Sequence, residues 1–286
     1  MEATVTSDAP GTTTGTAHPS DRIDTSVAHP ARRYNYWLGG KDNFQADRDS
    51  GDEMAAHFPT IRTSALENRR FLQRAVGYLA REAGIRQFLD IGTGIPTANN
   101  THEVAQSIAP EARVVYVDND PIVLAHARAL LTSSAEGATA YIDADLREPE
   151  KILNHPDLLR TIDLSRPVAL MLVAILHFVP DGDDPYAVVR RLLEALPPGS
   201  YLAASHATHD YLPPEVAEAA RAAARGGGPH GVINLRSLDE FTRFFDGLEL
   251  VEPGIGSVAE WRAEQEPQPR PSVVEVSMYG GVARKS

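Results

Sequence analysis

Two short segments of the chain carry the residue types that most clearly indicate chemistry. Residues 88–97 (FLDIGTGIPT) have the pattern of a buried strand that breaks into a glycine turn, and residues 115–120 (VYVDND) that of a strand ending in acids. In open α/β sheets, a glycine turn after one strand and a carboxylate after the next strand together bind a nucleoside. We therefore expect a nucleoside-binding site at one edge of a sheet.

The individual residues of these segments suit that role. Gly92 and Gly94 lack the Cβ atom that would obstruct a positive φ or a close approach of the backbone to a ligand. Asp118 ends the second strand, and its two oxygens suit the two hydroxyls of an unphosphorylated ribose. We assign the adjacent Asn119 to the same site. Asp90, just before the glycines, can hold a cationic or amino-bearing tail through charge-assisted hydrogen bonds.

Missing elements narrow the choice of nucleoside. A pyrophosphate-binding fingerprint needs a third glycine where this chain has Thr97, preceded by Pro96, and this disfavours NAD or FAD. No Gly-Lys-Ser/Thr sequence is present, which argues against a Walker-type ATP site. S-adenosylmethionine is a nucleoside without a phosphate chain and fits the remaining features. A nicotinamide-dependent oxidoreductase, and a protein that binds the nucleoside without catalysis, stay as alternatives.

The same segments resemble successive motifs of class I S-adenosylmethionine-dependent methyltransferases, in the usual order. These motifs are DIGTG at 90–94, Asp118, IDADL at 142–146 and LMLVAILHFVPD at 170–181. The segments 35–47 (NYWLGGKDNFQAD), 68–72 (NRRFL) and 280–285 (GGVARK) resemble the actinobacterial S-adenosyl methyltransferase family, long known as a domain of unknown function. The resemblance extends over residues 25–286. It implies a class I fold, S-adenosylmethionine as the cofactor and methyl transfer as the activity.

The resemblance also implies further cofactor contacts. Asp145 follows the third predicted strand, where the family's adenine-recognising acid lies, although an aspartate there can equally cap the next helix. Leu146 is expected to pack on the face of the purine. Near the amino terminus, Tyr36, Gly39 and Asn43 are the expected contacts of a cap over the cofactor.

Two features of the amino-terminal region leave alternatives open. The aromatic side chains of residues 34–43 can cover a sulfonium through cation–π attraction, worth roughly 0.5 to 2 kcal/mol, or can dock the segment on the core. Arg69 can pair with the methionine carboxylate in bidentate geometry. Arg70 is the alternative, because only the phase of the helix decides which of the two arginines faces the cleft.

Three histidines are candidates for a general base. His177 lies at the carboxyl end of the predicted fourth strand, and the unperturbed histidine pKa of about 6.5 suits proton transfer. His206 and His209 follow the fifth strand and are comparable candidates. A histidine after an apolar strand is also commonly a packed, hydrogen-bonded core residue. We name His177 as the catalytic candidate.

Three aspartates after the fourth strand, at positions 181, 183 and 184, have the oxygen ligands that a hard cation such as magnesium prefers. The sequence PDGDDP is more simply a solvated turn with acids at the start of the next helix, so we expect no metal site. The strand-four exit has AILH instead of the Asn/Asp-Pro-Pro-Tyr/Phe signature of base amino-methyltransferases. This disfavours nucleic acid as the methyl acceptor.

Composition limits the function further. The chain has 39 acidic and 27 basic residues, and its formal charge of -12 would repel a polyphosphate backbone. With no cysteine, the chain can use neither disulfides nor thiol-based catalysis. No segment approaches about 18 consecutive apolar residues, and the amino terminus is polar. We expect a cytoplasmic protein with no membrane or nucleic-acid partner that methylates an oxygen or nitrogen of a small molecule.

These residues must be positioned by a fold in which strands and helices alternate. We expect helices over 64–83, 101–109, 121–131, 148–159, 185–196 and 214–225. The first strand is the one that begins at residue 88 and leads into the glycine turn. Further strands are expected over 113–117, 139–142, 170–176, 201–205, 248–251 and 273–282. This alternation predicts a parallel, doubly wound α/β sheet. By resemblance the fold is Rossmann-like, with seven mostly parallel strands, an antiparallel final strand, and helices on both faces.

The remaining stretches define the organisation of the chain. Residues 1–22 lack apolar periodicity and predict a disordered tail. We expect residues 23–286 to form a single domain with a helical cap over residues 23–84. The sequence GGGPH at 226–230 predicts a flexible connector that can act as a lid, and the prolines of residues 261–271 predict an extended surface loop.

Overall fold

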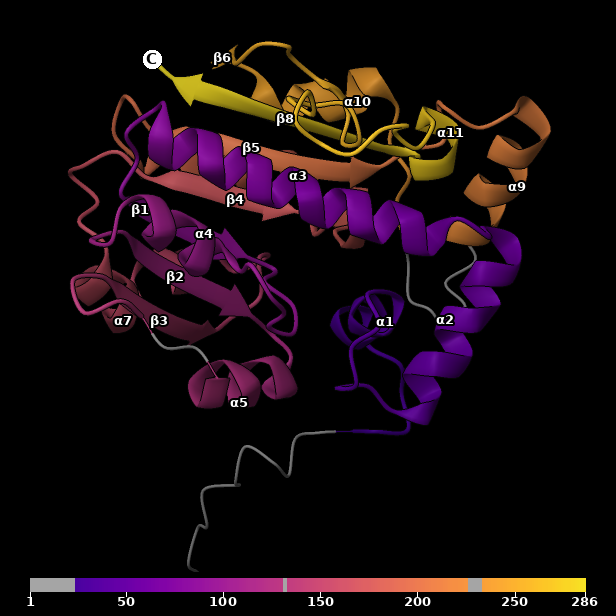
Figure 1. The fold of residues 1–286 in the computed structure, drawn as a ribbon, viewed down its shortest axis with the longest axis horizontal. Coiled ribbons are helices and arrows are strands. Elements are labelled where there is room, and N and C mark those ends of the chain that lie inside the picture. Colours follow the sequence, from indigo (N-terminus) through magenta and orange to yellow (C-terminus); the bar gives the residue numbers. More distant parts are fainter. Residues whose placement is uncertain (1–23, 131–132, 226–232) are drawn as a thin grey trace, which may run out of the picture.

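The computed structural model describes residues 24–130, 133–225 and 233–286. The predicted tail over residues 1–22 and the predicted connector at 226–230 lie outside the described residues. In the described part of the chain, one sheet is covered by helices on both faces (Figure 1). The predicted α/β class is confirmed.

The sheet has the strand order β3-β2-β1-β4-β5-β8-β6, and the short β7 pairs with β8 beside this path. β1 to β5 are parallel, whereas β8 is antiparallel to both of its neighbours, β5 and β6. The predicted antiparallel final strand is thus confirmed, and β7 is additional to the seven predicted strands. The strands are β1 (Gln87–Ile91), β2 (Arg113–Asp118), β3 (Ala138–Asp143), β4 (Ala169–Val173), β5 (Tyr201–Ala207), β6 (Leu248–Leu250), β7 (Gly256–Ser257) and β8 (Met278–Lys285).

Helices precede, connect and follow these strands. In α1, α6, α7 and α8 a proline occupies the first turn, where its missing N–H would have no helical partner anyway. The helices are α1 (Pro30–Trp37), α2 (Gln45–His57), α3 (Ile61–Arg81), α4 (Thr101–Ile108), α5 (Pro121–Leu130), α6 (Pro149–Leu153), α7 (Pro156–Thr161), α8 (Pro185–Glu194), α9 (Pro214–Arg225), α10 (Leu238–Thr242) and α11 (Val273–Val276).

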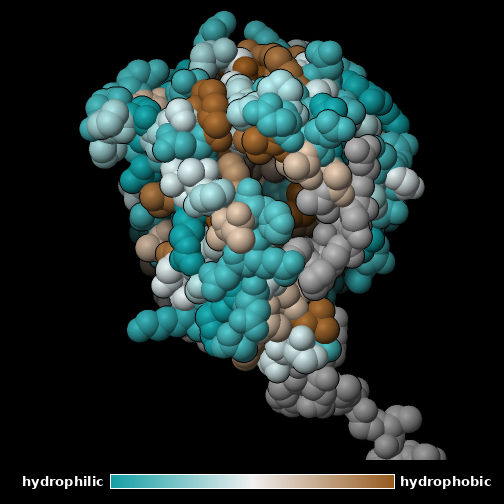
Figure 2. Space-filling view, turned by 90° about the vertical axis from the view of Figure 1, so that its right-hand side faces the viewer, coloured by the Kyte–Doolittle hydropathy of each residue, from teal (hydrophilic) through white to brown (hydrophobic). Residues whose placement is uncertain are grey.

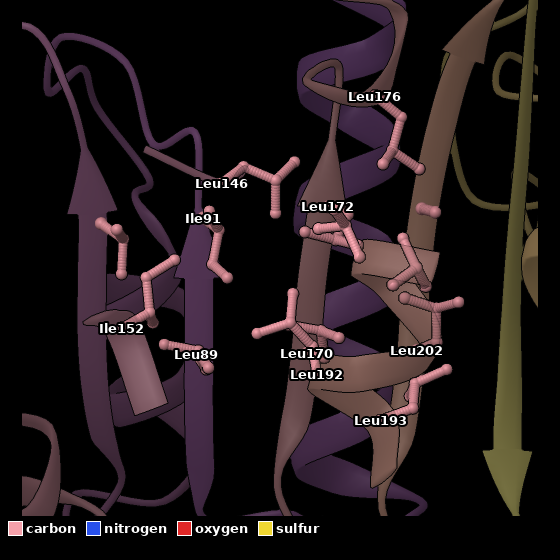
Figure 3. Close-up of a cluster of buried hydrophobic side chains, with 14 of the residues drawn as sticks. Leu89, Ile91, Leu146, Ile152, Leu170, Leu172, Leu176, Leu192, Leu193 and Leu202 are labelled. Carbon is pink, nitrogen blue, oxygen red and sulfur yellow. The ribbon is translucent and has the colours of Figure 1, made fainter. Parts of the chain in front are cut away.

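The core consists of two large clusters of apolar side chains, one on each face of the sheet. Successive residues of β1 alternate between them: Phe88 belongs to the cluster that includes α3 and α4, whereas Leu89 and Ile91 belong to the other. Figure 3 shows this other cluster, where leucines of β4, β5 and α8 gather beside Leu89 and Ile91. Because the central strands are buried on both faces, they appear in the sequence as continuous apolar runs.

The carboxyl ends of the parallel strands point toward the side of the molecule where α1, α2 and α9 lie (Figure 1). A small third cluster joins the amino-terminal segment to this edge, because Ala31 and Phe44 pack against Ile95, Ile122 and Val123. Ile95 belongs to the glycine turn after β1. The amino-terminal segment therefore packs against the edge where open α/β sheets bind ligands.

Three predicted elements have different limits in the structure. The fourth strand ends at Val173, because Ala174 adopts a left-handed conformation with φ of +57°, and a 3-10 helix, η2 (Leu176–Phe178), follows. The predicted helix over 148–159 is divided into α6 and α7, since Pro156 cannot continue the hydrogen bonding of a preceding helix. The predicted strand over 273–282 begins as α11 and becomes β8 only after Ser277.

The predicted surface loop over residues 261–271 begins in the core. Trp261 is 1% exposed and packs edge-on against Phe71 of α3, with ring centroids 5.4 Å apart. The prolines that suggested a surface loop carry no information about this distant partner. No helix of the described stretches has the length and apolar character that crossing a membrane requires.

Candidate functional site

The glycine turn after β1 has the backbone that the sequence predicts. Gly92 and Gly94 have φ values of +77° and +68°, in the region that favours glycine. A Cβ atom on Gly92 would lie 2.5 Å from Cγ1 of Ile175, which belongs to the segment after β4. A Cβ atom on Gly94 would meet nothing within 4 Å. Gly92 is therefore required by internal packing, whereas Gly94 borders open space that a ligand can enter.

This difference gives a prediction for two matched substitutions. Gly92→Ala combines a left-handed alanine with a clash against Ile175, and we expect it to lower the free energy of unfolding by about 2 to 4 kcal/mol. Gly94→Ala adds only the left-handed conformation, at about 1 to 2 kcal/mol. Urea denaturation of both variants measures the difference. Equal losses would show that the contact with Ile175 does not constrain the turn.

Asp118 ends β2 as predicted and is buried beside the glycine turn. Its Oδ2 accepts a hydrogen bond from the backbone N–H of Gly94 at 2.8 Å, and its Oδ1 accepts one from the N–H of Asp120 at 3.0 Å. Burial raises the pKa of Asp118, although these two donors oppose the shift. Each oxygen keeps a second lone pair, so the carboxylate can fix the turn and still accept hydrogen bonds from a diol.

Asp90 lies at the other side of the turn and is also buried. The hydroxyl of Thr101, the first residue of α4, donates to its Oδ2 at 2.6 Å. Burial raises the pKa of Asp90 to about 6, while Thr101 and the positive charge of Arg69 work in the opposite direction. Through this hydrogen bond, Asp90 links the end of β1 to the start of α4.

The structure decides between the two candidate arginines of α3. Arg69 reaches the turn and donates from Nη2 to Oδ1 of Asn100 at 2.8 Å, whereas Arg70 pairs with Glu67 at 2.6 Å. The Nε atom of Arg69 is buried and has no hydrogen-bond partner among the described residues. A buried donor without a partner costs about 1 to 3 kcal/mol, and an anionic ligand group beside it would remove that cost.

Asn119 and Asp145 are brought together at the exits of β2 and β3. The amide of Asn119 donates to Oδ2 of Asp145 at 3.0 Å. Arg147 donates to the same carboxylate from its backbone N–H and its guanidinium, and these hydrogen bonds lower the pKa of Asp145 to about 2. Asp145 therefore closes a turn with Arg147, instead of capping α6, which begins after Glu148.

Leu146 is 5% exposed and belongs to the large cluster that contains Ile91 (Figure 3). Most of its side chain packs in the core, and only a small part is exposed to solvent. Contact of Leu146 and of Asp145 with an adenine ring stays a prediction.

The amino-terminal side chains that were predicted to contact the cofactor mostly form hydrogen bonds with other residues of the amino-terminal segment. Tyr36 donates its hydroxyl to Asp52, and the guanidinium of Arg62 lies 4.6 Å from its ring centroid. The amide of Asn43 donates to Asn35 at 2.9 Å and to the carbonyl of Gly40 at 3.0 Å. These bonds shape the loop after α1. The exposed Gly39, with φ of +79°, ends that helix.

Other residues, which sequence reasoning missed, attach the amino-terminal segment to the site. Nε of Arg32 lies 3.2 Å from Oδ2 of Asp120, and Nδ1 of His29 lies 3.0 Å from the same oxygen. Burial works to raise the pKa of Asp120, but His29, the N–H of Ile122 and Arg32 together lower it. Since the N–H of Asp120 is bonded to Asp118, the segment is coupled to the predicted ribose carboxylate through one residue.

The exit of β4 is held from the α3 side by a buried chain of hydrogen bonds. The N–H of Ala174 donates to Oγ of Ser205 at 2.9 Å, and this hydroxyl donates to Oδ1 of Asn68 at 2.6 Å. The amide of Asn68 in turn donates to the hydroxyl of Tyr34 in α1 at 2.9 Å. The left-handed Ala174 is therefore stabilised by β5, α3 and α1 together.

Arg236 holds the same exit from the opposite face and has no sequence motif of its own. It is 2% exposed and donates to the carbonyls of Leu176 and Val179, each at 3.1 Å, and to Asp181 at 2.6 Å. Its Nη1 lies 2.8 Å from Nε2 of His206, whose Nδ1 lies 2.7 Å from the carbonyl of Ala207. Both ring nitrogens of His206 are thus engaged, so this histidine supports Arg236.

His177 lies at the β4 exit as predicted and is 7% exposed. Its Nδ1 is buried without a hydrogen-bond partner among the described residues, and its ring lies 5.5 Å from that of His206. Burial lowers the pKa of His177 to about 3, and the nearby Arg236 adds to the effect. A histidine with so low a pKa is a weak proton acceptor, which disfavours it as the general base.

The buried histidines also predict how stability depends on pH. The folded pKa of His177 is about 3, so below the ordinary value of about 6.5 the unfolded chain binds more protons, and stability falls as the pH falls. We expect a loss of about 1 to 1.5 kcal/mol per buried histidine between pH 7.5 and 5.5. Burial lowers the pKa of His206 in the same way. Urea denaturation at both pH values should show a smaller difference for His177→Gln; an unchanged difference would contradict this.

The aspartates after η2 have structural partners. Asp184 caps α8 by accepting from the N–H of Ala187 at 3.1 Å, and Asp183 pairs with Arg147 at 3.3 Å. In the stretches that the structure describes, no three side chains of the metal-binding types lie together. The turn is therefore explained by helix capping and ion pairing.

Figure 2 views the face toward which the strand ends point. It is hollowed near its centre, with hydrophobic atoms visible in the hollow and mainly hydrophilic residues around it. The Gly92–Ile175 contact links the glycine turn directly to the β4 exit, and the pairing of Val173 with Ser205 links the β4 exit to β5. The exits of β1, β4 and β5 thus lie side by side at this edge.

Comparisons with known proteins identify relatives along almost the whole chain. The family model for S-adenosyl methyltransferase matches residues 16–286. A DUF574 family protein from Streptomyces avermitilis MA-4680, with a solved structure, is 52% identical, with 93% of this chain and 100% of that chain covered and a TM-score of 0.86. A protein described as a "putative methyltransferase" from Thermobifida fusca YX is 47% identical, with coverages of 92% and 97% and a TM-score of 0.82. None of the curated proteins matches.

The residues of the site fit the cofactor of this family. Gly94 borders open space, the carboxylate of Asp118 has lone pairs for a ribose diol, and Arg69 offers a buried donor without a partner among the described residues. The family decides against the alternative of a nicotinamide-dependent oxidoreductase. The chain belongs to the S-adenosyl methyltransferase family, and it is an S-adenosylmethionine-dependent methyltransferase.

Proposed function

We propose that this enzyme methylates an oxygen or nitrogen of a small molecule. The observation that carries the proposal is the packing of the amino-terminal segment over the glycine turn, through Phe44 on Ile95 and Arg32 on Asp120. This segment encloses one side of the strand edge, which suits a small acceptor better than a long polymer. The formal charge of -12 also disfavours nucleic acid as a partner.

In this proposal, the chain's own residues bind and orient the cofactor. Asp118 accepts hydrogen bonds from the ribose hydroxyls, Asn119 lies beside it, and Asp90 faces the amino group of the methionine part. Arg69 binds the methionine carboxylate. The bound cofactor supplies a methyl group already activated on a sulfonium. Alignment of the acceptor with that methyl group is then the main task of the protein, and such positioning can supply about 7 to 11 kcal/mol.

The role of Arg69 can be tested with two nucleosides that differ in their tails. We expect Arg69→Gln to weaken binding of S-adenosylhomocysteine about 10- to 100-fold, because a charge-assisted hydrogen bond to the carboxylate is lost. Methylthioadenosine has no carboxylate, and its affinity should not change. Calorimetric titration measures both. Arg70→Gln is the matched control, since Arg70 pairs with Glu67. An equal loss for both nucleosides would mean that Arg69 only supports the turn.

A product search tests the proposed reaction itself. The full-length protein is incubated with S-adenosylmethionine that carries a deuterated methyl group and with the deproteinised small-molecule fraction of a bacterial extract. Mass spectrometry then searches for molecules that acquire the label. Labelled oxygen or nitrogen methyl products would support the proposal. Label on added RNA, DNA or protein, but on no small molecule, would overturn it.

A further inference from the structure

Most arginine side chains of this protein contact an acid, a carbonyl group or a ring. Among the arginines whose side chains the structure describes, the exceptions, which form no hydrogen bond, ion pair or ring contact with another described residue, are Arg81, Arg166, Arg190 and Arg284. Arg166 and Arg284 line the same hollow, which has a volume of about 400 Å³. Unpaired positive charge is therefore gathered at one place, in a chain whose formal charge is -12.

This hollow lies at the edge of the sheet opposite the glycine turn. It is lined by the segment between α3 and β1, the residues before β4, the turn before β5 and the end of β8. The carboxyl end of the chain, which follows β8, marks this edge in Figure 1. β1 begins at the hollow with Gln87 and has 5 residues, a length of roughly 16 Å, before the glycine turn. The hollow is therefore distinct from the cofactor site.

The acids near the hollow do not neutralise Arg166 and Arg284. Glu82 is the acid in its lining, and both of its oxygens accept from Nη1 of Arg262, at 3.0 and 2.9 Å. Glu249 lies opposite Arg284 in the ladder between β6 and β8, but the two side chains form no ion pair in the described part of the chain. The positive charge of the two arginines is thus available to a bound anion.

A third arginine forms a fixed wall of the hollow. Nε of Arg86 lies 2.6 Å from Glu111, and its Nη1 donates to the carbonyls of Ala80 and Ile85 at 2.8 and 3.0 Å. Its Nη2 has no hydrogen-bond partner among the described residues and is not one of their buried, unpartnered atoms. The backbone of Arg166 is also held, because the buried Gln87 donates to its carbonyl at 3.3 Å.

A larger hollow of about 780 Å³ adjoins the first and shares Arg86, Gln87 and Arg166 with it. Its lining also contains the acids Glu111, Glu136 and Asp163 and the apolar side chains of residues 159 and 164. Carboxylates would repel an anion in the larger hollow. The negative group of a ligand therefore fits the smaller hollow, and an uncharged part of the same ligand fits the larger one.

We infer that the smaller hollow binds a phosphoryl group of a small molecule. A guanidinium presents its N–H groups as a planar fork that matches two phosphate oxygens, and a tetrahedral phosphate can meet several forks from different directions. Arg166 and Arg284 supply one fork each, and Nη2 of Arg86 supplies a further donor. The volume of about 400 Å³ lies in the range of about 300 to 1,000 Å³ that is usual for small-molecule sites. The inference does not depend on the proposed function.

Calorimetric titration of the full-length protein with inorganic pyrophosphate at low ionic strength tests this site. We expect Arg166→Gln and Arg284→Gln each to weaken binding about 10-fold, because each removes a charge-assisted pair of hydrogen bonds. Arg190→Gln is the matched control, since Arg190 is also exposed and without a partner among the described residues but does not line the hollow. No binding at about 10 mM pyrophosphate, or an equal loss in all three variants, would overturn the inference.

Two further titrations test the place and the chemistry of the ligand. With saturating S-adenosylhomocysteine present, pyrophosphate should bind with unchanged affinity, because the hollow lies at the opposite edge of the sheet. Displacement of pyrophosphate would put it in the cofactor site and overturn the inference. Citrate carries planar carboxylates in place of tetrahedral phosphates, and we expect it to bind at least about 10-fold more weakly. Equal affinities for citrate and pyrophosphate would contradict a site for a phosphoryl group.

Discussion

An Asp118→Ala variant is expected to bind S-adenosylhomocysteine at least about 100-fold more weakly than the unaltered protein. The carboxylate of Asp118 is the proposed acceptor for the ribose hydroxyls, and it also receives the N–H groups of Gly94 and Asp120. Its removal therefore eliminates ligand contacts and releases the glycine turn at the same time. Hydrogen bonds to charged groups are worth about 1.5 to 3 kcal/mol each, so losing two is enough for this effect. Calorimetric titration measures the affinity.

The control for this experiment is another aspartate that closes a turn. Asp163 accepts from the N–H and the hydroxyl of Ser165, in the segment that leads into the opposite edge of the sheet. Asp163→Ala should leave the affinity for S-adenosylhomocysteine unchanged. Asp118→Asn keeps one acceptor oxygen and should have an intermediate effect. If Asp118→Ala has a normal circular dichroism spectrum and binds with unaltered affinity, the cofactor does not use the β2 exit.

An Arg236→Met variant is expected to lose about 3 to 5 kcal/mol of folding stability, a large share of the total for a protein of this kind. Methionine fills most of the volume but donates no hydrogen bond. The carbonyls of Leu176 and Val179 and Nε2 of His206 would then be buried acceptors without their present donor. Because all three belong to the β4 and β5 exits, the loss should be concentrated there. Urea denaturation measures the stability.

Arg243 provides a matched control for Arg236. Its guanidinium lies 3.9 Å from the ring centroid of Tyr186, which Arg236 also approaches at 5.8 Å, but Arg243 is exposed. We expect Arg243→Met to cost less than about 1 kcal/mol. Hydrogen exchange should accelerate at residues 174–179 in Arg236→Met and not in Arg243→Met. Similar stabilities for the two variants would show that the buried hydrogen bonds of Arg236 contribute little.

Two consecutive residues of β5 explain why the β4 exit is so well defined. Ser205 and His206 point to opposite faces of the sheet, as neighbours in a strand do. Ser205 holds the N–H of Ala174 from one face, and His206 supports Arg236 on the other. The position of the β4 exit is therefore set by the sheet itself, and the hydrogen bond between Asn68 and Tyr34 joins the amino-terminal segment to it.

The sequence by itself determined the local chemistry of the site and the class of the fold. A glycine turn after a buried strand, and an acid at the end of the next strand, are each encoded in a few consecutive residues. The places of Gly92 and Gly94 in the turn and of Asp118 at the end of β2 could therefore be predicted from the sequence, and their contacts with the cofactor stay predictions. The parallel order of the strands follows from the alternation of strands and helices, because the handedness of their connections leaves few arrangements.

Some local patterns were insufficient. The apolar run 170–176 continues past the true end of β4, since nothing in it shows that Ala174 turns left-handed. That conformation depends on Ser205, which accepts the N–H of Ala174 from the neighbouring strand. The helix α11 within the predicted last strand is a different case. Ser272 and Glu275 form a capping box, and this Ser-x-x-Glu pattern is a local signal in the sequence that the strand prediction missed.

Only the tertiary structure decided which of several equivalent side chains face the site. Arg69 and Arg70 are neighbours on one helix, and the packing of α3 turns only Arg69 toward the glycine turn. His177 and His206 are both histidines near the end of an apolar strand, and they differ because Arg236 and the carbonyl of Ala207 engage both ring nitrogens of His206, whereas Nδ1 of His177 has no partner among the described residues. Burial, charge and hydrogen bonding belong to pairs of groups that are far apart along the chain. Folding alone creates those pairs, so the sequence alone could not assign these roles.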